Sequence, residues 1–267
     1  MRLTTTNDPL TAVAADWARI GLWLSVEAAS EPVDIEALIV RTARVAREDE
    51  RLFVGAASWL AVHHGWVNGR RLIALVTDLA RVDRVGSAVA GALLTLASRG
   101  AGGLETGRAS ELDGAIEACR PLARPRPLFT VMERFPALRS DLRAAATPLF
   151  RRWGLWHDDE SLKLTAIRPA AWLLRHVPEL RVRAVVGPSL ESDLITLALS
   201  GPLTARDLAR ITGVSYAAAH GAADRLVARG LLRRQRAGAR QMLRLTGVAT
   251  IAIPRSTRRL SHAPPAP

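Results

Sequence analysis

Arginines gather on a short stretch near the C-terminal end of the chain, and their spacing suits contact with phosphate groups. Arg233, Arg234, Arg236 and Arg240 lie on either side of Gly238. A guanidinium is permanently charged and presents its N–H donors in a fork that matches phosphate oxygens. Leucines flank both arms, and the glycine suits a tight turn. The pattern predicts a two-stranded hairpin whose arginines lie along a phosphate backbone.

The stretch before this hairpin predicts three short helices. The first extends from Leu190 towards Gly201. Thr204 can cap the second helix, with Asp207 in its first turn, and Gly213 can end that helix in a left-handed conformation. Leu208 and Ile211 are expected to face inward on it. Ser215 can cap the third helix, over 216–229, after a turn short enough for a helix-turn-helix.

The third helix is the expected reading helix. Ala219, Ala222, Ala223 and Leu226 recur at helical spacing and should face inward, which leaves a polar face. In a major-groove complex Tyr216 and His220 would make polar contacts, and Ala217 would touch a thymine methyl. No Arg, Asn or Gln occupies these leading positions, so we expect affinity to come mainly from phosphates and specificity to be modest. The predicted DNA-binding residues are Thr204, Ser215, Tyr216, Ala217, His220, Arg225, Arg233, Arg234, Arg236 and Arg240.

Two segments of this region resemble known families. Gly213-Val-Ser-Tyr216 and the residues from Ala222 to Leu232 are similar to the C-terminal winged helix of many Fic-type proteins. They also resemble bacterial transcription regulators of the multiple-antibiotic-resistance type. The resemblance covers about the last third of the chain without the tail, and it implies a winged helix-turn-helix that serves as a binding module. The Fic signature, His-Pro-Phe followed by Gly-Asn-Gly-Arg, does not occur in residues 1–189. Nucleotidyl transfer is therefore not implied.

Charge is distributed unevenly along the 267 residues. The net charge is +12, of which residues 187–267 carry +8, with 12 basic and 4 acidic side chains. Such an excess in the smaller segment is typical of a module that meets a polyanion. The single cysteine, Cys119, excludes an intrachain disulfide and favours a reducing compartment. No apolar run is long enough to span a membrane, so we expect a cytoplasmic protein.

The first two thirds of the sequence predict an all-α domain over 8–186. Helix-start signals occur at Asp8-Pro9, Asp34, Asp49 and Asn68, and the first helix is expected to run to about Ala29. Further helices are expected over 84–98, 110–120, 136–153 and 169–176. Residues 154–168 are expected to be irregular or to include a short strand at 162–167. The fold class is therefore mainly α: a multi-helix bundle or short helical solenoid followed by a winged helix-turn-helix.

No motif in the helical part predicts catalysis, a metal site or a cofactor. His63 and His64 are adjacent on a helix and point about 100° apart, so a half-buried and an exposed histidine are expected instead of a chelating pair. The run from His157 to Glu160 lacks metal-ligand spacing and is expected as a solvated loop, salt-bridged to Arg151 and Arg152. The glycines from Gly100 to Gly107 do not form a phosphate loop. Most of the seven tryptophans are expected to pack in the core.

These patterns predict three segments: the helical domain 8–186 for dimerisation, partner or ligand binding, the winged helix 189–246, and a basic, proline-rich, disordered tail 254–267. The leading hypothesis is a non-enzymatic, bacterial-type transcriptional regulator that binds double-stranded DNA as a homodimer. The alternative is an adaptor or antitoxin-like protein whose winged helix and helical domain bind protein partners. A third reading is an enzyme whose site lies in the helical half. Target sequence and effector are left open.

Overall fold

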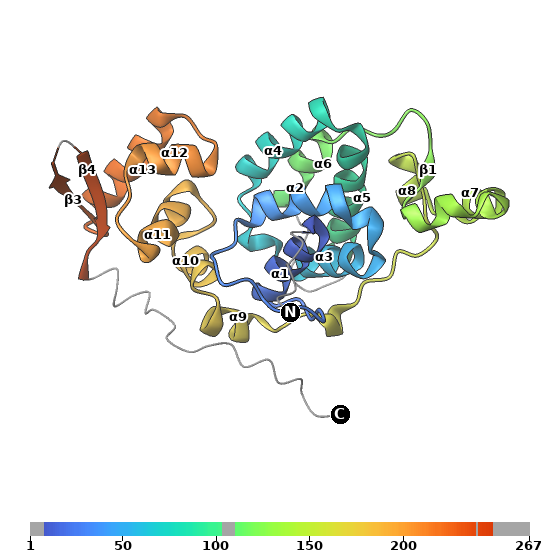
Figure 1. The fold of residues 1–267 in the computed structure, drawn as a ribbon, viewed down its shortest axis with the longest axis horizontal. Coiled ribbons are helices and arrows are strands. Elements are labelled where there is room, and N and C mark those ends of the chain that lie inside the picture. Colours follow the sequence, from blue (N-terminus) through green and yellow to red (C-terminus); the bar gives the residue numbers. More distant parts are fainter. Residues whose placement is uncertain (1–7, 103–109, 239, 248–267) are drawn as a thin grey trace, which may run out of the picture. The chain divides into compact units, whose positions relative to one another are not determined.

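The computed structural model describes residues 8–102, 110–238 and 240–247, and the chain divides into two compact units, 1–168 and 169–267 (Figure 1). Helices dominate both units, which confirms the expected mainly α class. No helix among the described residues is long and apolar enough to cross a membrane. The tail expected over 254–267 lies outside the described residues.

The first unit is built around one long helix. Helix α5 (Arg84–Gly102) packs against α2 (Ile35–Val45), α3 (Glu50–His63), α4 (Gly69–Val82) and α6 (Ser110–Ala118), and α1 (Pro9–Arg19) packs against α2. Small residues in the middle of α5 permit this close approach. A Cβ atom at Gly91 would lie 2.4 Å from the indole of Trp153, so only glycine fits there. This helix bundle agrees with the expected mainly α fold class.

Side-chain caps start four of these helices as expected. Asp8, Asp34, Asp49 and Asn68 each accept hydrogen bonds from backbone N–H groups in the first turn of the following helix. These bonds satisfy donors that a helix N-terminus otherwise leaves without a partner. Local sequence therefore determines where the helices of the bundle begin.

The first helix is shorter than predicted. It ends at Arg19 instead of continuing to about Ala29, and Gly21 follows with a positive φ of 94°. The chain then runs extended, with Leu22 bridged to Ile167 and the Trp23 N–H donating to the Ala166 carbonyl at 2.8 Å. The apolar spacing of this stretch thus reflects burial against a distant loop and not a continued helix.

The end of the first unit is more irregular than predicted. The single helix expected over 136–153 is wrong: the structure has a short 3-10 turn η4 (Pro136–Leu138), α7 (Arg139–Ala145) and α8 (Pro148–Arg152). Pro148 disfavours the helical conformation at Thr147, whose ψ is 160°. Of the two alternatives expected for residues 154–168, the strand at 162–167 is absent, and that stretch is irregular with the 3-10 turn η5 (Leu164–Ala166). A two-residue parallel pair, β1 (Arg126–Pro127) with β2 (Leu155–Trp156), was not expected.

Tryptophan rings fill the core of this unit. Trp17 and Trp59 are completely buried and meet edge to face, with ring centroids 5.5 Å apart. The Trp17 indole N–H donates to the Thr42 hydroxyl at 2.7 Å, and that of Trp59 donates to the Ile20 carbonyl at 2.8 Å. Both of these buried indole N–H groups have a partner, as burial of an indole requires. The expected packing role of these two residues is confirmed.

The second unit begins earlier than the boundary expected at Gly187-Pro188. It contains α9 (Ala170–His176), α10 (Pro178–Val186), α11 (Leu190–Ser200), α12 (Ala205–Thr212), α13 (Tyr216–Ala228) and the strands β3 (Leu232–Ala237) and β4 (Arg240–Leu245). Helix α10, which was expected only as a basic segment, packs on α11. Buried Arg183 donates to Asp193 at 2.9 Å, and Val182 joins the apolar core of the unit. These contacts place α10 with the C-terminal helices.

Candidate nucleic-acid interface

Local sequence signals position the helix-turn-helix as predicted. Thr204 and Asp207 form a capping box: the Thr204 hydroxyl accepts from the Asp207 N–H at 3.1 Å, and the Asp207 carboxylate accepts from the Thr204 N–H at 2.9 Å. Gly213 ends α12 in the left-handed conformation, with φ at 72°. Ser215 caps α13 through the Ala218 N–H at 3.2 Å. Thr204 and Ser215 therefore cap the N-termini of α12 and α13. Both residues also lie at the ends of these helices that face solvent.

The prediction is wrong for one residue that was expected in the core of this domain. Ile211 is 47% exposed, whereas Thr212 is buried and its hydroxyl donates to the Leu208 carbonyl at 2.7 Å. Positions four apart on a helix lie nearly above one another, so Leu208 and Thr212 form the inward stripe. A polar residue that satisfies its own hydroxyl can therefore occupy the core, and the isoleucine faces solvent. The inward positions expected on α13, from Ala219 to Leu226, are buried.

The hairpin divides its arginines between two faces. Antiparallel register pairs Leu232 with Leu245, Arg234 with Leu243, and Arg236 with Gln241. Since Leu232 and Leu243 are buried, this face of the hairpin packs on the domain core. The intervening pairs belong to the other face, where Arg233 lies directly opposite Arg244. Leu203 extends the sheet by a bridge to Leu243, with its N–H donating at 3.3 Å and its carbonyl accepting at 2.7 Å.

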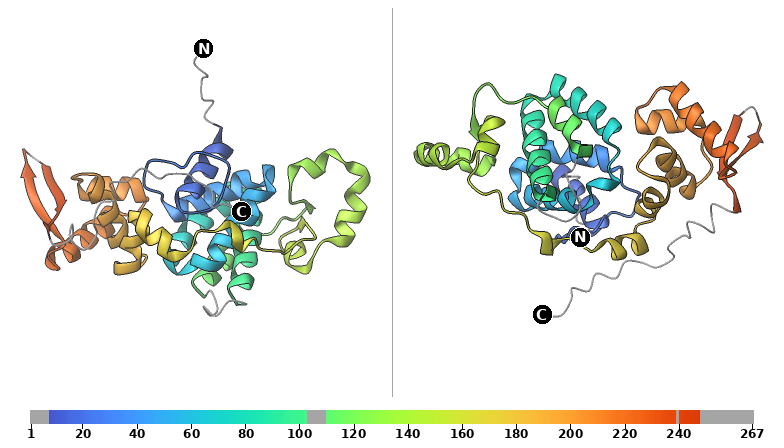
Figure 2. Two further views of the ribbon diagram at one scale, coloured as in Figure 1. Left: turned by 90° about the horizontal axis from the view of Figure 1, so that it is seen from below. Right: turned by 180° about the vertical axis from the view of Figure 1, so that it is seen from behind.

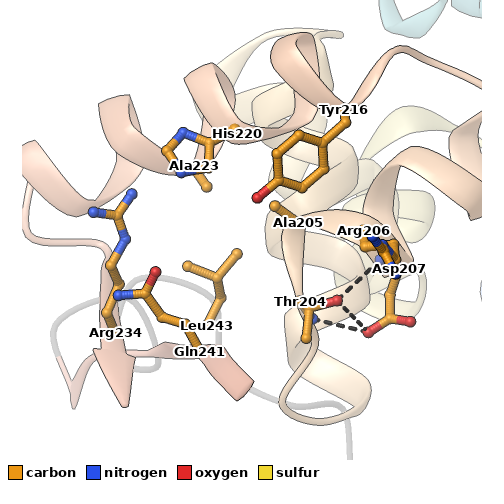
Figure 3. Close-up of a pocket in the computed structure, with 10 residues that line it drawn as sticks. All are labelled: Thr204, Ala205, Arg206, Asp207, Tyr216, His220, Ala223, Arg234, Gln241 and Leu243. Atoms are coloured by element: carbon orange, nitrogen blue, oxygen red, sulfur yellow. Dashed lines mark hydrogen bonds between the residues drawn. The ribbon is translucent and has the colours of Figure 1, made fainter. Parts of the chain in front are cut away.

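A groove of about 450 Å³ opens between α12, α13 and the hairpin. Figure 3 shows Tyr216 and His220 from α13 on one side, the Thr204–Asp207 capping box on another, and Arg234 and Gln241 from the hairpin on a third. Tyr216 is 58% exposed. The structure thus places four predicted DNA-binding residues around one hollow: Thr204, Tyr216, His220 and Arg234.

Two of the predicted arginines are held by carboxylates of the same domain. Arg234 forms an ion pair with Asp224, which also lies 3.1 Å from the Nδ1 atom of His220. Arg225 donates to Glu191 at 2.6 Å, although 56% of the Arg225 side chain stays exposed. Both guanidiniums thus reach the surface with part of their charge already balanced.

Arg233, Arg236 and Ala217 are at the surface. Arg233 and Arg236 are exposed, and Arg236 donates to the Gly238 carbonyl at 3.3 Å. Ala217 is exposed in the first turn of α13. The backbone of Arg240 pairs with Ala237, and its side chain lies outside the described part of the structure.

Sequence reasoning missed Arg206, Arg244 and Gln241. Arg206 is exposed at the start of α12 and lines the groove with Gln241, while Arg244 faces Arg233 across the hairpin. Strand alternation would have placed Arg244 beside Arg233, because residues at alternate positions share a face. Among the described residues, no carboxylate lies within ion-pair distance of Arg206, Arg233 or Arg244.

The histidines of the first unit differ from their predicted surroundings. His63 and His64 are both buried, so the expectation of one half-buried and one exposed histidine is wrong. His63 stacks on Trp66 with ring centroids 4.8 Å apart, and burial lowers its pKa to about 4. His157 is buried between Phe129 and Phe150, and burial lowers its pKa as well.

The loop after His157 also has other partners than expected. Glu160 accepts hydrogen bonds from Arg99 at 2.9 Å and from Thr147, and it does not pair with Arg151 or Arg152. Within the described ranges, no three His, Cys, Asp or Glu side chains are grouped closely enough to hold a metal ion.

Three helices, a left-handed turn and an antiparallel hairpin in this order define a winged helix-turn-helix domain of the type found in regulators. Residues 194–241 match the family model of the MarR family. This agrees with the resemblance to multiple-antibiotic-resistance regulators, whereas the Fic-type resemblance stays a prediction. The match covers less than a fifth of the 267 residues, so it describes the domain and not the whole chain. No curated protein and no solved structure matches the chain.

Proposed function

We propose that the protein is a DNA-binding transcriptional regulator that inserts α13 into the major groove and lays the β3–β4 hairpin along the phosphate backbone. The observation that carries this proposal is the shared surface of α13 and the hairpin. Tyr216 and His220 border the same groove as Arg234. Exposed Arg236 lies on the same face of β3 as Arg234, and exposed Arg233 lies on the opposite face of the hairpin. The MarR family match over 194–241 supports the assignment.

Each part of this surface has a distinct role in the proposal. Tyr216 and His220 reach base edges, and exposed Ala217 touches a thymine methyl. Arg233, Arg236 and Arg240 bind phosphates. The N-terminus of α12, with Thr204 and Ser215 as caps of the two helices, adds backbone N–H groups that favour an anion.

The ion pairs of the groove limit the specificity that we propose. Arg234 is neutralised in part by Asp224, and Arg225 by Glu191. No Arg, Asn or Gln occupies the first turn of α13, so bidentate reading of bases is absent there. Affinity in this proposal therefore depends chiefly on phosphate contacts and should fall steeply with salt.

The helical unit completes the proposed regulator. Operators that consist of two half-sites are bound by symmetric dimers, so we propose that the chain acts as a homodimer. Residues 8–186 would supply dimerisation, partner binding or ligand sensing, although the last two helices of this range, α9 and α10, belong to the second compact unit.

The proposal is tested by fluorescence anisotropy with a pool of random duplex DNA, titrated at several salt concentrations between about 50 and 200 mM. Replacing Arg233 and Arg236 together by alanine should weaken binding and lower the slope of log affinity against log salt by about 2. The control is the double change Arg51→Ala with Arg70→Ala, which removes two exposed charges from α3 and α4. Absence of duplex binding at low salt, or an unchanged slope in the wing variant, would refute the proposal.

A protein-binding role is the second candidate, and one observation favours it. Ile211 and Tyr216 are large apolar residues, 47% and 58% exposed, on either side of the turn between α12 and α13. Exposed apolar neighbours on a charged domain often mark a contact with another protein. If Ile211→Ser abolished capture of a partner in pull-down experiments while the chain failed to bind duplex DNA, the adaptor reading would replace the regulator.

A further inference from the structure

The first unit holds a second concentration of arginine that the function proposed above does not use. Residues 120–156 contain eight arginines and two acidic residues, a net charge of +6. Residues 1–186 as a whole carry only +4, so the rest of that range is net negative. The segment comprises β1, α7, α8 and β2, and α7 stands away from the α1–α6 bundle in every view (Figure 1 and Figure 2).

Two adjoining hollows lie in this segment. One of about 580 Å³ and one of about 340 Å³ share Pro125 and Trp156 in their walls, and the two hollows together are here called the Trp156 groove. Its basic residues come from β1 and the loop before it, from α7 and from α8. They are Arg124, Arg126, Arg139, Arg143 and Arg151.

Most of the positive charge in the Trp156 groove is not balanced locally. Among the described residues, no carboxylate lies within ion-pair distance of Arg124, Arg126, Arg139 or Arg143. The one acidic residue of the lining, Glu133, is engaged by Arg47 at 2.5 Å. Asp158 and Asp159 follow Trp156 in the chain but line neither hollow.

The frame of the Trp156 groove is fixed by backbone hydrogen bonds. The Arg126 N–H donates to the Gly154 carbonyl and the Leu128 N–H to the Trp156 carbonyl, both at 3.1 Å. Arg47 donates to the Leu128 and Pro127 carbonyls at 2.9 and 3.1 Å and so ties β1 to the bundle. The guanidinium of Arg151 donates to the Ala144 carbonyl at 2.7 Å and holds the end of α7. The groove is therefore preformed.

We propose that the Trp156 groove binds a single strand of nucleic acid, with phosphates on its arginines and an unpaired base against the indole. Arginines from three elements, spread over two adjoining hollows, suit a backbone with several phosphates better than a single anion. Trp156 is half-buried and lines both hollows, so a base that enters either one meets it. A duplex keeps its bases paired and stacked, and it cannot offer a free face to an indole.

The experiment uses the full chain and a fluorescent oligothymidylate. Wild-type protein should bind the strand at low salt, and Arg139→Ala with Arg143→Ala should weaken binding at least tenfold and lower the salt slope by about 1.4. Both arginines are exposed on α7, where alanine favours the helix, so folding should be retained. Trp156→Leu should weaken binding without changing the salt slope, and Trp156→Phe should restore most of it, because phenylalanine keeps a ring for the base.

Three comparisons separate this site from other sources of binding. Arg233→Ala with Arg236→Ala should leave strand binding within twofold, because the hairpin belongs to the other site, and Arg51→Ala with Arg70→Ala should do the same. Equal loss in any of these variants would overturn the proposal, as would failure of wild type to bind the strand. Displacement of the bound strand by a free mononucleotide at the same concentration as the strand would also contradict the proposal. So would a duplex of equal length that binds as tightly and depends on the same α7 arginines.

Discussion

Asp224 is the residue that most directly controls the charge of the winged-helix groove. Its carboxylate pairs with Arg234 and lies 3.1 Å from Nδ1 of His220, so it balances the guanidinium that β3 directs into that groove. An approaching phosphate competes with this carboxylate for the same guanidinium. The charge available for DNA is therefore smaller than the number of arginines suggests.

Replacing Asp224 by asparagine should strengthen duplex binding severalfold. The change removes a negative charge from the groove and makes Arg234 available to a phosphate, so the salt slope should rise by about 1. Anisotropy titrations with random duplex measure both quantities. Asp78→Asn, which removes an exposed carboxylate from α4, is the control. Weaker binding of Asp224→Asn would show that the ion pair is needed to position Arg234.

His63 should make the first unit sensitive to acid. Burial lowers its pKa to about 4 from an ordinary 6.5, so the unfolded chain binds the proton first as pH falls. Its contribution is therefore fully present above about pH 6.5 and is lost between about 6.5 and 4, with a total of roughly 3 kcal/mol. Urea unfolding of wild type and His63→Gln at pH 7 and 5 measures it. The variant should lose less stability over that interval, although His157 leaves part of the dependence. Equal losses would contradict the prediction.

Cys119 should be chemically inert in the folded chain. Burial raises the pKa of its thiol to about 12, and the Sγ atom donates to the Ala115 carbonyl at 3.3 Å. Because the thiolate is the reactive form, iodoacetamide at pH 8 should not label the native protein but should label it fully in denaturant. Mass spectrometry counts the adducts, and rapid labelling of native protein would contradict the burial.

At the scale of elements, two glycines of the helix-turn-helix should respond in opposite directions. Gly213 has a φ of 72°, and nothing lies within 4 Å of a Cβ added there, so Gly213→Ala should cost about 1 kcal/mol by backbone strain alone. Gly221 lies inside α13 with ordinary helical geometry, and Gly221→Ala should gain about 0.5–1 kcal/mol. Thermal unfolding of the full chain compares them. If both variants were less stable than wild type, side-chain packing and not backbone conformation would determine the effect of these substitutions on stability.

Elements with strong local signals could be predicted from sequence, and those defined by distant contacts could not. Capping residues such as Asp34 and Thr204 mark helix starts because their hydrogen bonds are local. Helix α10 escaped prediction because Glu179 and Arg183 are buried on its inward side, which hides the apolar pattern. The Trp156 groove was missed because its arginines come from separate elements that only the β1–β2 pair brings together. Of the winged-helix groove, Thr204, Tyr216, His220 and Arg234 were predicted. The ion pair of Arg234 with Asp224 was not, because it joins β3 to α13 and depends on tertiary geometry.

For the whole molecule, the division of the chain predicts which fragments fold. Residues 169–247 should form a stable unit, because α10 contributes Val182 to the core and Arg183 to a buried ion pair with Asp193. A fragment of residues 187–247 leaves Asp193 without that partner and should be less stable by about 3 kcal/mol or fail to fold. Circular dichroism on heating compares the two fragments. Equal melting temperatures for the two fragments would contradict this prediction and would support a domain boundary at Gly187-Pro188.

The contact of Trp153 with α5 has a consequence for how ligand binding at the Trp156 groove affects the first unit. Gly91 leaves room for the indole, whose N–H donates to the Thr95 hydroxyl at 3.1 Å, and Trp153 is only three residues from Trp156. A ligand that shifts Trp156 therefore acts, through three residues of chain, on the helix against which most of the bundle packs. We expect ligand binding at the Trp156 groove to change the rate of amide hydrogen exchange along α5. Such a change would link the groove to the rest of the first unit, as ligand sensing requires.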